Sequence, residues 1–354
     1  MSKFWSKVIR GLAPYVPGEQ PKDRKYVKLN TNENPYPPSP AVLEVIREHT
    51  GQDLRLYPDP NGDILKTAVA SCYQVDKNNV FVGNGSDEVL AFTFIAFFKQ
   101  EKPILYPDIT YSFYPVYSKL FEIEALTIPL TTDFQINLDD YPAENGGVIF
   151  PNPNAPTGRL LNLEQIESLL KRNTASVVVV DEAYVDFGGV SCIPLVENYP
   201  NLLVCQTLSK ARSLAGMRIG YAIGAPELID GLERAKNCFN SYTLSRLAQV
   251  AGTAAMNDRL YFETTCQAII ATREWVVREL EQLDFEVVPS AANFVFIRHY
   301  NRKAGELFCE LRQRGVLVRY FNLPRIDNHL RVTIGTDDEM KELIKQLKAI
   351  LSGG

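Results

Sequence analysis

One short segment combines two hydroxyl side chains, a lysine and an arginine: Thr207, Ser209, Lys210 and Arg218. An apolar run at 202–205 predicts a buried strand just before it, and a second β-like run follows Arg218. Hydroxyls and a guanidinium hold phosphate oxygens through charge-assisted hydrogen bonds, each worth roughly 1.5–3 kcal/mol. The amine of Lys210 can form a Schiff base with an aldehyde on the same bound molecule. The alternative is a solvated loop end, so this segment needs support from the rest of the chain.

An acid after a second apolar run supplies that support. Residues 176–180 are mostly β-branched, as expected for a central parallel strand buried on both faces, and Asp181 follows them. A carboxylate there is costly to bury without a cationic partner. The protonated ring nitrogen of pyridoxal phosphate is such a partner, and Tyr184 could hydrogen-bond the phenolic oxygen of the same ring. A structural Asp that caps the next helix is the alternative.

A glycine-rich turn precedes a predicted apolar helix at 89–98. Gly85, Ser86 and Asp87 stand in this turn, after a short predicted strand at 80–82. Backbone N–H groups and the helix dipole favour an anion at such a position. An ordinary capped helix, whose acids complement the dipole, is the alternative.

Two further side chains follow predicted strands. Tyr111 lies just past the strand at 104–106, where open α/β sheets place ligands, and it could stack on a planar ring or simply pack in a loop. The strand at 147–150 closes on a loop with three prolines, which would hold Asn154 in place.

Composition excludes several classes of protein. The 354 residues carry a net charge of −5 with no basic patch, so we expect no nucleic-acid partner. No apolar stretch approaches the roughly 20 residues that span a bilayer, and the N-terminus lacks an apolar signal region, so we expect a soluble cytoplasmic protein without a membrane partner. Six dispersed cysteines indicate buried thiols in a reducing compartment. Three histidines without metal-ligand spacing argue against a metal site and against a Ser-His-Asp hydrolase.

Three parts are expected along the chain. Residues 1–40, rich in Pro, Asn and Tyr, predict an extended arm. Strands and helices alternate through 41–245, which predicts a large domain with a mostly parallel sheet covered by helices. Residues 246–354 predict a smaller α+β domain. Its Arg319 and Arg331 lie at strand ends, where they would suit an anionic substrate if they converge on a cleft and would otherwise be surface charge.

Taken in order, these motifs resemble the fold-type I pyridoxal-phosphate-dependent aminotransferases over essentially the whole chain. The motifs that carry the resemblance are GNGSDE, NPNAPTG, DEAY, TLSKA and GMRIGY. The arm and the segments SAANFVFIR, RGVLVRYF and LRVTIGT are similar to those of the subfamily that acts on histidinol phosphate. The resemblance implies a seven-stranded sheet, pyridoxal 5′-phosphate as cofactor and a homodimer. It also implies amino-group exchange between L-histidinol phosphate and 2-oxoglutarate in histidine biosynthesis, giving imidazole acetol phosphate and L-glutamate.

The resemblance also implies roles by position. Lys210 would be the Schiff-base lysine that then moves the substrate proton, Asp181 would pair with the pyridinium nitrogen, and Tyr184 would bond the phenolate oxygen. The remaining cofactor contacts would come from Tyr111, Gly85, Ser86, Asp87, Asn154, Thr207, Ser209 and Arg218, with Tyr57 reaching the cofactor phosphate of the partner subunit. The substrate site, to which the arm contributes, would be lined by Tyr15, Asn32, Arg319 and Arg331.

One position departs from the family pattern. The family commonly has Asn directly before Pro-Thr-Gly to bond the phenolate oxygen, whereas this chain has Ala155. Either Asn154 shifts into that role or Tyr184 serves alone. Three other functions stay open: an aromatic amino-acid aminotransferase, a lyase similar to threonine-phosphate decarboxylase, and a catalytically idle binding protein. The joint presence of Lys210 and Asp181 makes the last the weakest.

Overall fold

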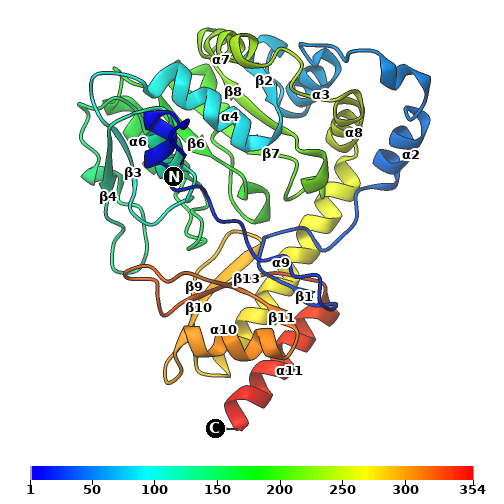
Figure 1. Ribbon diagram of the computed structural model, residues 1–354, viewed down its shortest axis with the longest axis vertical. Helices are drawn as coiled ribbons and strands as arrows, with labels where there is room; N and C mark the ends of the chain where they lie inside the picture. Colours follow the sequence, from blue (N-terminus) through cyan, green and yellow to red (C-terminus); the bar gives the residue numbers. More distant parts are fainter. Residues whose placement is uncertain (1, 354) are drawn as a thin grey trace.

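Residues 2–353, which the computed structural model describes, contain a central sheet of seven strands (Figure 1). The sheet order is β2-β8-β7-β6-β5-β3-β4, and β8 is antiparallel to both of its neighbours while the other pairs are parallel. The mostly parallel sheet predicted from the sequence is therefore confirmed. The strands are β2 (Val80–Gly83), β3 (Ile104–Pro107), β4 (Ala125–Ile128), β5 (Val148–Pro151), β6 (Val178–Asp181), β7 (Leu202–Thr207) and β8 (Gly220–Gly224).

Burial explains why these runs form strands. Every residue of β6 and β7 is buried, as expected for central strands covered on both faces. Both strands are parallel, so their carboxyl ends meet at one edge, and Asp181 pairs in register with Cys205. That edge therefore brings Asp181 close to the segment that carries Lys210. In contrast, β4 is half exposed at the end of the sheet, and this strand was not predicted from the sequence.

Helices cover the sheet on both faces (Figure 1). Two of them begin at clear sequence signals: Ser39 caps the helix that starts at Pro40, and Asn162 forms a capping box with Gln165. The helices of this domain are α2 (Pro40–Glu48), α3 (Asp63–Tyr73), α4 (Gly85–Thr93, continued by a π-helical turn to Phe98), α5 (Tyr114–Leu120), α6 (Leu163–Arg172), α7 (Pro226–Phe239) and α8 (Arg246–Asn257).

The position of α8 moves the predicted domain boundary. Residues 246–354 were predicted to form the small domain, but α8 packs against α2 and α3. Its Ala248 and Ala251 belong to the apolar core beneath the large sheet. The amphipathic pattern was read correctly as a helix, but the pattern does not say which core the apolar face meets.

The small domain has its own sheet and core. Within the described chain its strands run in the order β12-β13-β10-β9, all antiparallel, and the long helix α9 connects it to the large domain (Figure 1). The elements are α9 (Arg259–Glu281), β9 (Phe285–Val288), β10 (Phe294–His299), α10 (Ala304–Gln313), β11 (Val316–Leu317), β12 (Arg319–Tyr320), β13 (Leu330–Thr333) and α11 (Asp337–Ser352).

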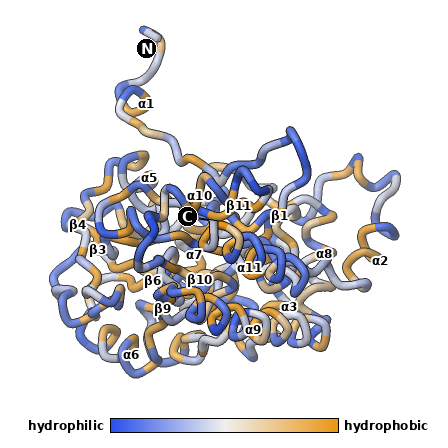
Figure 2. Tube along the Cα trace, turned by 90° about the horizontal axis from the view of Figure 1, so that it is seen from below, coloured by the Kyte–Doolittle hydropathy of each residue, from blue (hydrophilic) through white to orange (hydrophobic). Residues whose placement is uncertain are grey.

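The N-terminal arm is mostly extended and follows the small domain. Its strand β1 (Val27–Lys28) pairs in parallel with β11, and Glu19 forms an ion pair with Arg312. The arm begins with a short helix, α1 (Lys7–Gly11), which has no buried residue and projects from the body of the molecule (Figure 2). Across residues 2–353 we find no helix long and apolar enough to cross a membrane.

Candidate active site

A cavity of about 620 Å³ opens at the carboxyl edge of the large sheet, between the arm and the small domain. Most of the residues predicted for the site line it. They are Tyr15, Asn32, Ser86, Asp87, Tyr111, Asp181, Tyr184, Thr207, Ser209, Lys210, Arg218, Arg319 and Arg331. A single cavity therefore receives side chains from β6, from the segments after β3 and β7, from α4, from the arm and from the small domain.

Asp181 presents a buried carboxylate to this cavity. The residue is 4% exposed, and its oxygens accept hydrogen bonds from the Tyr114 hydroxyl at 3.0 Å and from the Ala183 N–H at 3.2 Å. Burial raises the pKa of this carboxyl from 3.8 to about 6. Among residues 2–353 no lysine, arginine or histidine forms an ion pair with it. The site thus contains an acid that would be stabilised by a cation supplied from outside the chain.

Lys210 and Tyr184 lie on the same side of the cavity. The Lys210 Nζ lies 3.3 Å from the Thr31 carbonyl oxygen and 5.6 Å from the centre of the Tyr184 ring. The backbone carbonyl of Lys210 accepts a hydrogen bond from the Asn34 side chain at 2.9 Å. The arm segment that follows β1 therefore contacts both ends of this lysine.

The start of α4 forms an anion cradle with Arg218. Gly85 has φ +82°, a conformation that residues with a side chain rarely adopt, and a Cβ at this position would lie 2.6 Å from Arg218 Nη2 and displace the guanidinium. Arg218 Nη2 lies 2.9 Å from Asp87 Oδ2. Gly220 is equally constrained, because its Cβ would lie 2.3 Å from the Ser86 nitrogen. These close approaches hold the backbone N–H groups of the helix start beside a guanidinium.

Tyr111, with the hydroxyl groups of Thr207 at the end of β7 and of Ser209 just after it, completes this end of the cavity. The Tyr111 hydroxyl donates to Asp87 Oδ1 at 2.7 Å, which fixes its ring over the cavity. Burial, with the neighbouring Asp87 charge, raises the pKa of Tyr111 well above its usual range, so the phenol stays neutral. Thr207 Oγ1 and Ser209 Oγ lie 3.0 Å apart on the loop that leads to Lys210.

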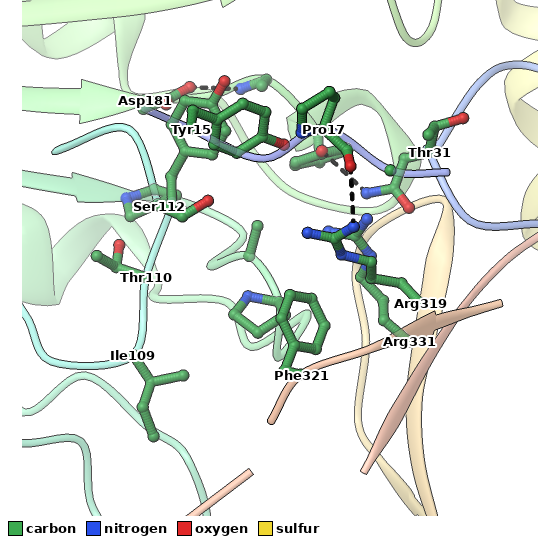
Figure 3. A pocket seen from close by; sticks show the side chains of 18 of the residues that line it. Tyr15, Pro17, Thr31, Ile109, Thr110, Ser112, Asp181, Arg319, Phe321 and Arg331 are labelled. Atoms are coloured by element: carbon green, nitrogen blue, oxygen red, sulfur yellow. Dashed lines mark hydrogen bonds between the residues drawn. The ribbon is translucent and has the colours of Figure 1, made fainter. Parts of the chain in front are cut away.

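Arg319, Arg331 and Tyr15 form the opposite end of the cavity. Arg319 donates to the carbonyl oxygens of Val16 and Pro17, at 3.2 and 3.4 Å, and Arg331 donates to that of Asn30 at 3.1 Å. Figure 3 shows these two guanidinium groups side by side, across the cavity from Asp181. Tyr15 stacks on Phe113 with 4.3 Å between ring centres, so the arm covers the cavity.

Three of the residues predicted for the site do not line the cavity. Gly85 has no side chain and lies against the Arg218 guanidinium. Asn154 is fully buried and donates to Ile109 O at 3.0 Å and to Thr157 Oγ1 at 3.1 Å, while the cavity wall is formed by Ala155. Tyr57 is 78% exposed and stacks on Tyr242 at 4.7 Å. The cofactor roles of Asn154 and Tyr57 remain predictions.

Two contributors were not predicted from the sequence. Tyr114, which bonds Asp181, belongs to a series of tyrosines at 111, 114 and 117, a spacing that places them near one another on a helical turn. Arg325 forms an ion pair with Asp108 at 2.7 Å, and this pair joins the two domains in the cavity wall. Within residues 2–353 no group of His, Cys, Asp or Glu could hold a metal ion.

Comparison with known proteins agrees with this geometry. Residues 24–347 match the family described as aminotransferase class I and II. The chain is 59% identical over 351 residues to histidinol-phosphate aminotransferase 1 of Hydrogenovibrio crunogenus, covering 99% of both chains. It is 56% identical over 352 residues to histidinol-phosphate aminotransferase of Clostridium acetobutylicum, covering 99% of this chain and 100% of the relative. The crystal structure of histidinol-phosphate aminotransferase from Sinorhizobium meliloti, in complex with pyridoxal-5′-phosphate, superposes with a TM-score of 0.90 at 24% identity, covering 100% and 99% of the two chains.

The fold and the cavity, with these matches, define a fold-type I aminotransferase of class I and II. The match to full-length relatives at 56–59% identity is closer than a shared fold requires. The chain belongs to the histidinol-phosphate aminotransferase family.

Proposed function

We propose that this chain uses pyridoxal 5′-phosphate to move the amino group of L-histidinol phosphate to 2-oxoglutarate, giving imidazole acetol phosphate and L-glutamate in histidine biosynthesis. One observation carries the proposal: a single cavity joins Lys210, Asp181 and Arg218 to a second pair of cations, Arg319 and Arg331. The full-length identity to histidinol-phosphate aminotransferases supports the choice of substrate.

The residues present fit this cofactor. The buried Asp181 carboxylate would hold a protonated ring nitrogen, because burial without a cation is what raises its pKa. The glycine-shaped start of α4, with Ser209 and Arg218, would hold the phosphate. When bound, pyridoxal phosphate supplies an aldehyde for the amino group and a ring that accepts electrons from the substrate carbon.

The side chains around the proposed cofactor position have separate roles in catalysis. Lys210 Nζ is the amine available to hold the aldehyde, and once released it can accept and return the substrate proton. Tyr111 would cover one face of the ring, and Tyr184 can donate a hydrogen bond to the ring oxygen. Tyr15 and the extended arm cover the mouth of the cavity and exclude water.

The two cationic ends of the cavity suit a cofactor phosphate and a substrate anion separately. Arg218 lies at the end formed by α4, whereas Arg319 and Arg331 lie beside the arm. The paired arginines would hold the phosphate of histidinol phosphate in one half of the reaction and a carboxylate of glutamate in the other.

Steady-state kinetics tests the substrate directly. With 2-oxoglutarate as acceptor, we expect kcat/KM for histidinol phosphate to exceed the values for phenylalanine and tyrosine. A preference for the aromatic amino acids would make this chain an aromatic aminotransferase, and release of carbon dioxide from a phosphorylated amino acid would make it a lyase.

We also propose that the active unit is a homodimer. Tyr57 is 78% exposed and carries no contact to the cavity of its own subunit, and Leu54 and Leu56 beside it are about half exposed. An exposed apolar surface of this kind is typical of a subunit interface. Mixing Lys210→Ala and Tyr57→Ala proteins tests the proposal, because a hybrid dimer regains one intact site only if Tyr57 acts across the interface. A mixture without regained activity would contradict it.

A reducing compartment is the proposed location, as expected for a cytoplasmic enzyme. All six cysteines of the described chain are unpaired, but only three of them are buried, so the prediction of buried thiols is wrong for Cys72, Cys238 and Cys309, which are exposed. Unchanged electrophoretic mobility with and without reductant, in protein taken from cells under thiol-blocking conditions, would agree with this location.

A further inference from the structure

Every polar group of Asn32 takes part in a hydrogen bond within the chain. Its backbone N–H donates to Thr333 Oγ1 at 2.9 Å, and its backbone carbonyl accepts from Asn293 Nδ2 at 3.1 Å. The Thr333 hydroxyl donates to Asn32 Oδ1 at 3.1 Å, and Asn32 Nδ2 donates to the Tyr184 hydroxyl oxygen at 3.0 Å. The residue is 1% exposed, and each of its polar atoms already has a partner within the chain.

This arrangement determines how Tyr184 uses its hydroxyl. An amide nitrogen can only donate, so the Tyr184 oxygen is the acceptor in its bond to Asn32. The hydroxyl hydrogen must therefore point elsewhere, and Tyr184 lines the cavity. In a buried site the accepted bond also strengthens the bond that the same hydroxyl donates.

We infer that Asn32 is a positioning residue for Tyr184, and not the substrate contact predicted from the sequence. It holds the phenol so that its hydrogen points at the ring oxygen of the bound cofactor. This inference rests on the proposed cofactor. It also accounts for Ala155, which lines the cavity but offers no side-chain donor, because a Tyr184 polarised by Asn32 can serve that oxygen alone.

The backbone conformation of Asn32 and its hydrogen-bond partners favour asparagine at this position. Asn32 has φ 55°, a left-handed conformation that Asn tolerates and that most other residues do not. Its anchors Thr333 and Asn293 both belong to the small domain, whereas Tyr184 follows β6 of the large domain. Phe294 of the small domain also packs edge-on against Tyr184, with 5.1 Å between ring centres. Asn32 therefore fixes the phenol relative to both domains.

The pH dependence of the visible absorbance of the bound cofactor tests the inference in the holoenzyme. Loss of a donor to an ionised ring oxygen makes that oxygen more basic and raises the midpoint of the absorbance change. We expect Tyr184→Phe to raise the midpoint by about half a unit to one unit, the equivalent of one ordinary hydrogen bond. Asn32→Gly, which suits the positive φ, should raise it by a smaller amount. The double variant should shift it no further than Tyr184→Phe alone, because Asn32 acts only through the hydroxyl.

Two further variants separate this role from others. Asn293→Ala also removes a hydrogen bond to Asn32 but leaves the bond between Asn32 and Tyr184. We therefore expect a lower thermal unfolding temperature for the cofactor-free protein, and an unchanged midpoint of the absorbance change in the holoenzyme. Asn32→Asp keeps the size and the backbone fit, but its carboxylate accepts the Tyr184 hydrogen, so the midpoint should rise at least as far as in Tyr184→Phe. The charged groups near Tyr184, namely Lys210, Arg331 and Asp181, are the same in every variant.

Several results would overturn the inference. An Asn32→Gly protein with an unchanged midpoint and a raised KM for histidinol phosphate would make Asn32 a substrate contact. Additive shifts in the double variant, or an equal shift in Asn293→Ala, would mean that Asn32 acts on the site by another route. Failure of the proposed function is distinguishable, because the wild-type protein would then show no cofactor absorbance at all.

Discussion

Replacement of Asp181 by Asn should stabilise the cofactor-free protein at alkaline pH while it removes activity. Burial raises the pKa of this carboxyl from its ordinary 3.8 to about 6. A rise of that size corresponds to on the order of 3 kcal/mol of unfolding free energy, because each pH unit is worth about 1.4 kcal/mol.

The direction in which stability changes with pH follows from proton binding at Asp181. Between pH 4 and pH 6 the folded protein binds more protons at Asp181 than the unfolded chain does, so stability falls as the pH rises through this range. Above about pH 6 the full cost of the buried charge is present, and below about pH 4 it is absent. Asn keeps the size of the side chain and can still bond Tyr114, so the variant avoids most of this cost.

Urea unfolding of cofactor-free wild type and Asp181→Asn, at pH 4 and pH 8, measures the effect. We expect the difference between the two proteins to change by about 3 kcal/mol in favour of the variant on going from pH 4 to pH 8. Added pyridoxal phosphate should reverse the order at pH 8, because only the wild type gains an ion pair. A difference that does not change with pH would refute the argument that Asp181 is a buried charge in need of a cation.

Three further substitutions have expected outcomes of their own. Arg218→Lys should weaken cofactor binding about 10- to 100-fold by titration of the cofactor-free protein, because a lysine cannot reproduce the charge-assisted bonds of the guanidinium; unchanged affinity would remove Arg218 from the anion cradle. Gly85→Ala should lower both cofactor affinity and the unfolding temperature, since its Cβ would lie 2.6 Å from Arg218 Nη2 at φ +82°; a normal affinity would show that the cradle tolerates a side chain. Glu182→Gln should destabilise the protein by about 1–3 kcal/mol in urea unfolding at pH 7, because this buried carboxylate accepts bonds from Ser191, Cys192 and Gln206 and the amide can accept only part of them, which leaves a buried donor unpaired; equal stability would contradict this, because it would mean that removing the charge, whose burial raises the pKa of Glu182, offsets the lost bonds.

The large domain could be read from the sequence because its signals are local. β-branched runs such as Val178–Asp181 are typical of central parallel strands buried on both faces, and they alternate with helices that carry their own caps. The edge strand Ala125–Ile128 gives no such signal, because half of it faces solvent. The domain assignment of α8 depends on which core its apolar face meets, and periodicity does not contain that information.

In the site, too, residues with a local sequence signal were predictable, whereas a role that depends on distant contacts was not. Lys210, Asp181 and Arg218 were predictable because each follows or precedes a strand, and strand ends meet at one edge of a parallel sheet. The role inferred for Asn32 was not predictable, since it depends on contacts with Tyr184 and Thr333, which are 152 and 301 residues away in the chain. Only the folded arrangement of both domains brings these side chains together.

The central claim is that Lys210 holds the cofactor. Borohydride reduction of the protein with pyridoxal phosphate, followed by proteolysis and mass spectrometry, tests it most directly. We expect bleaching of the visible absorbance and one phosphopyridoxyl group, on the peptide that contains Lys210. A label on another lysine, or full activity in a Lys210→Ala protein, would show that Lys210 does not hold the cofactor.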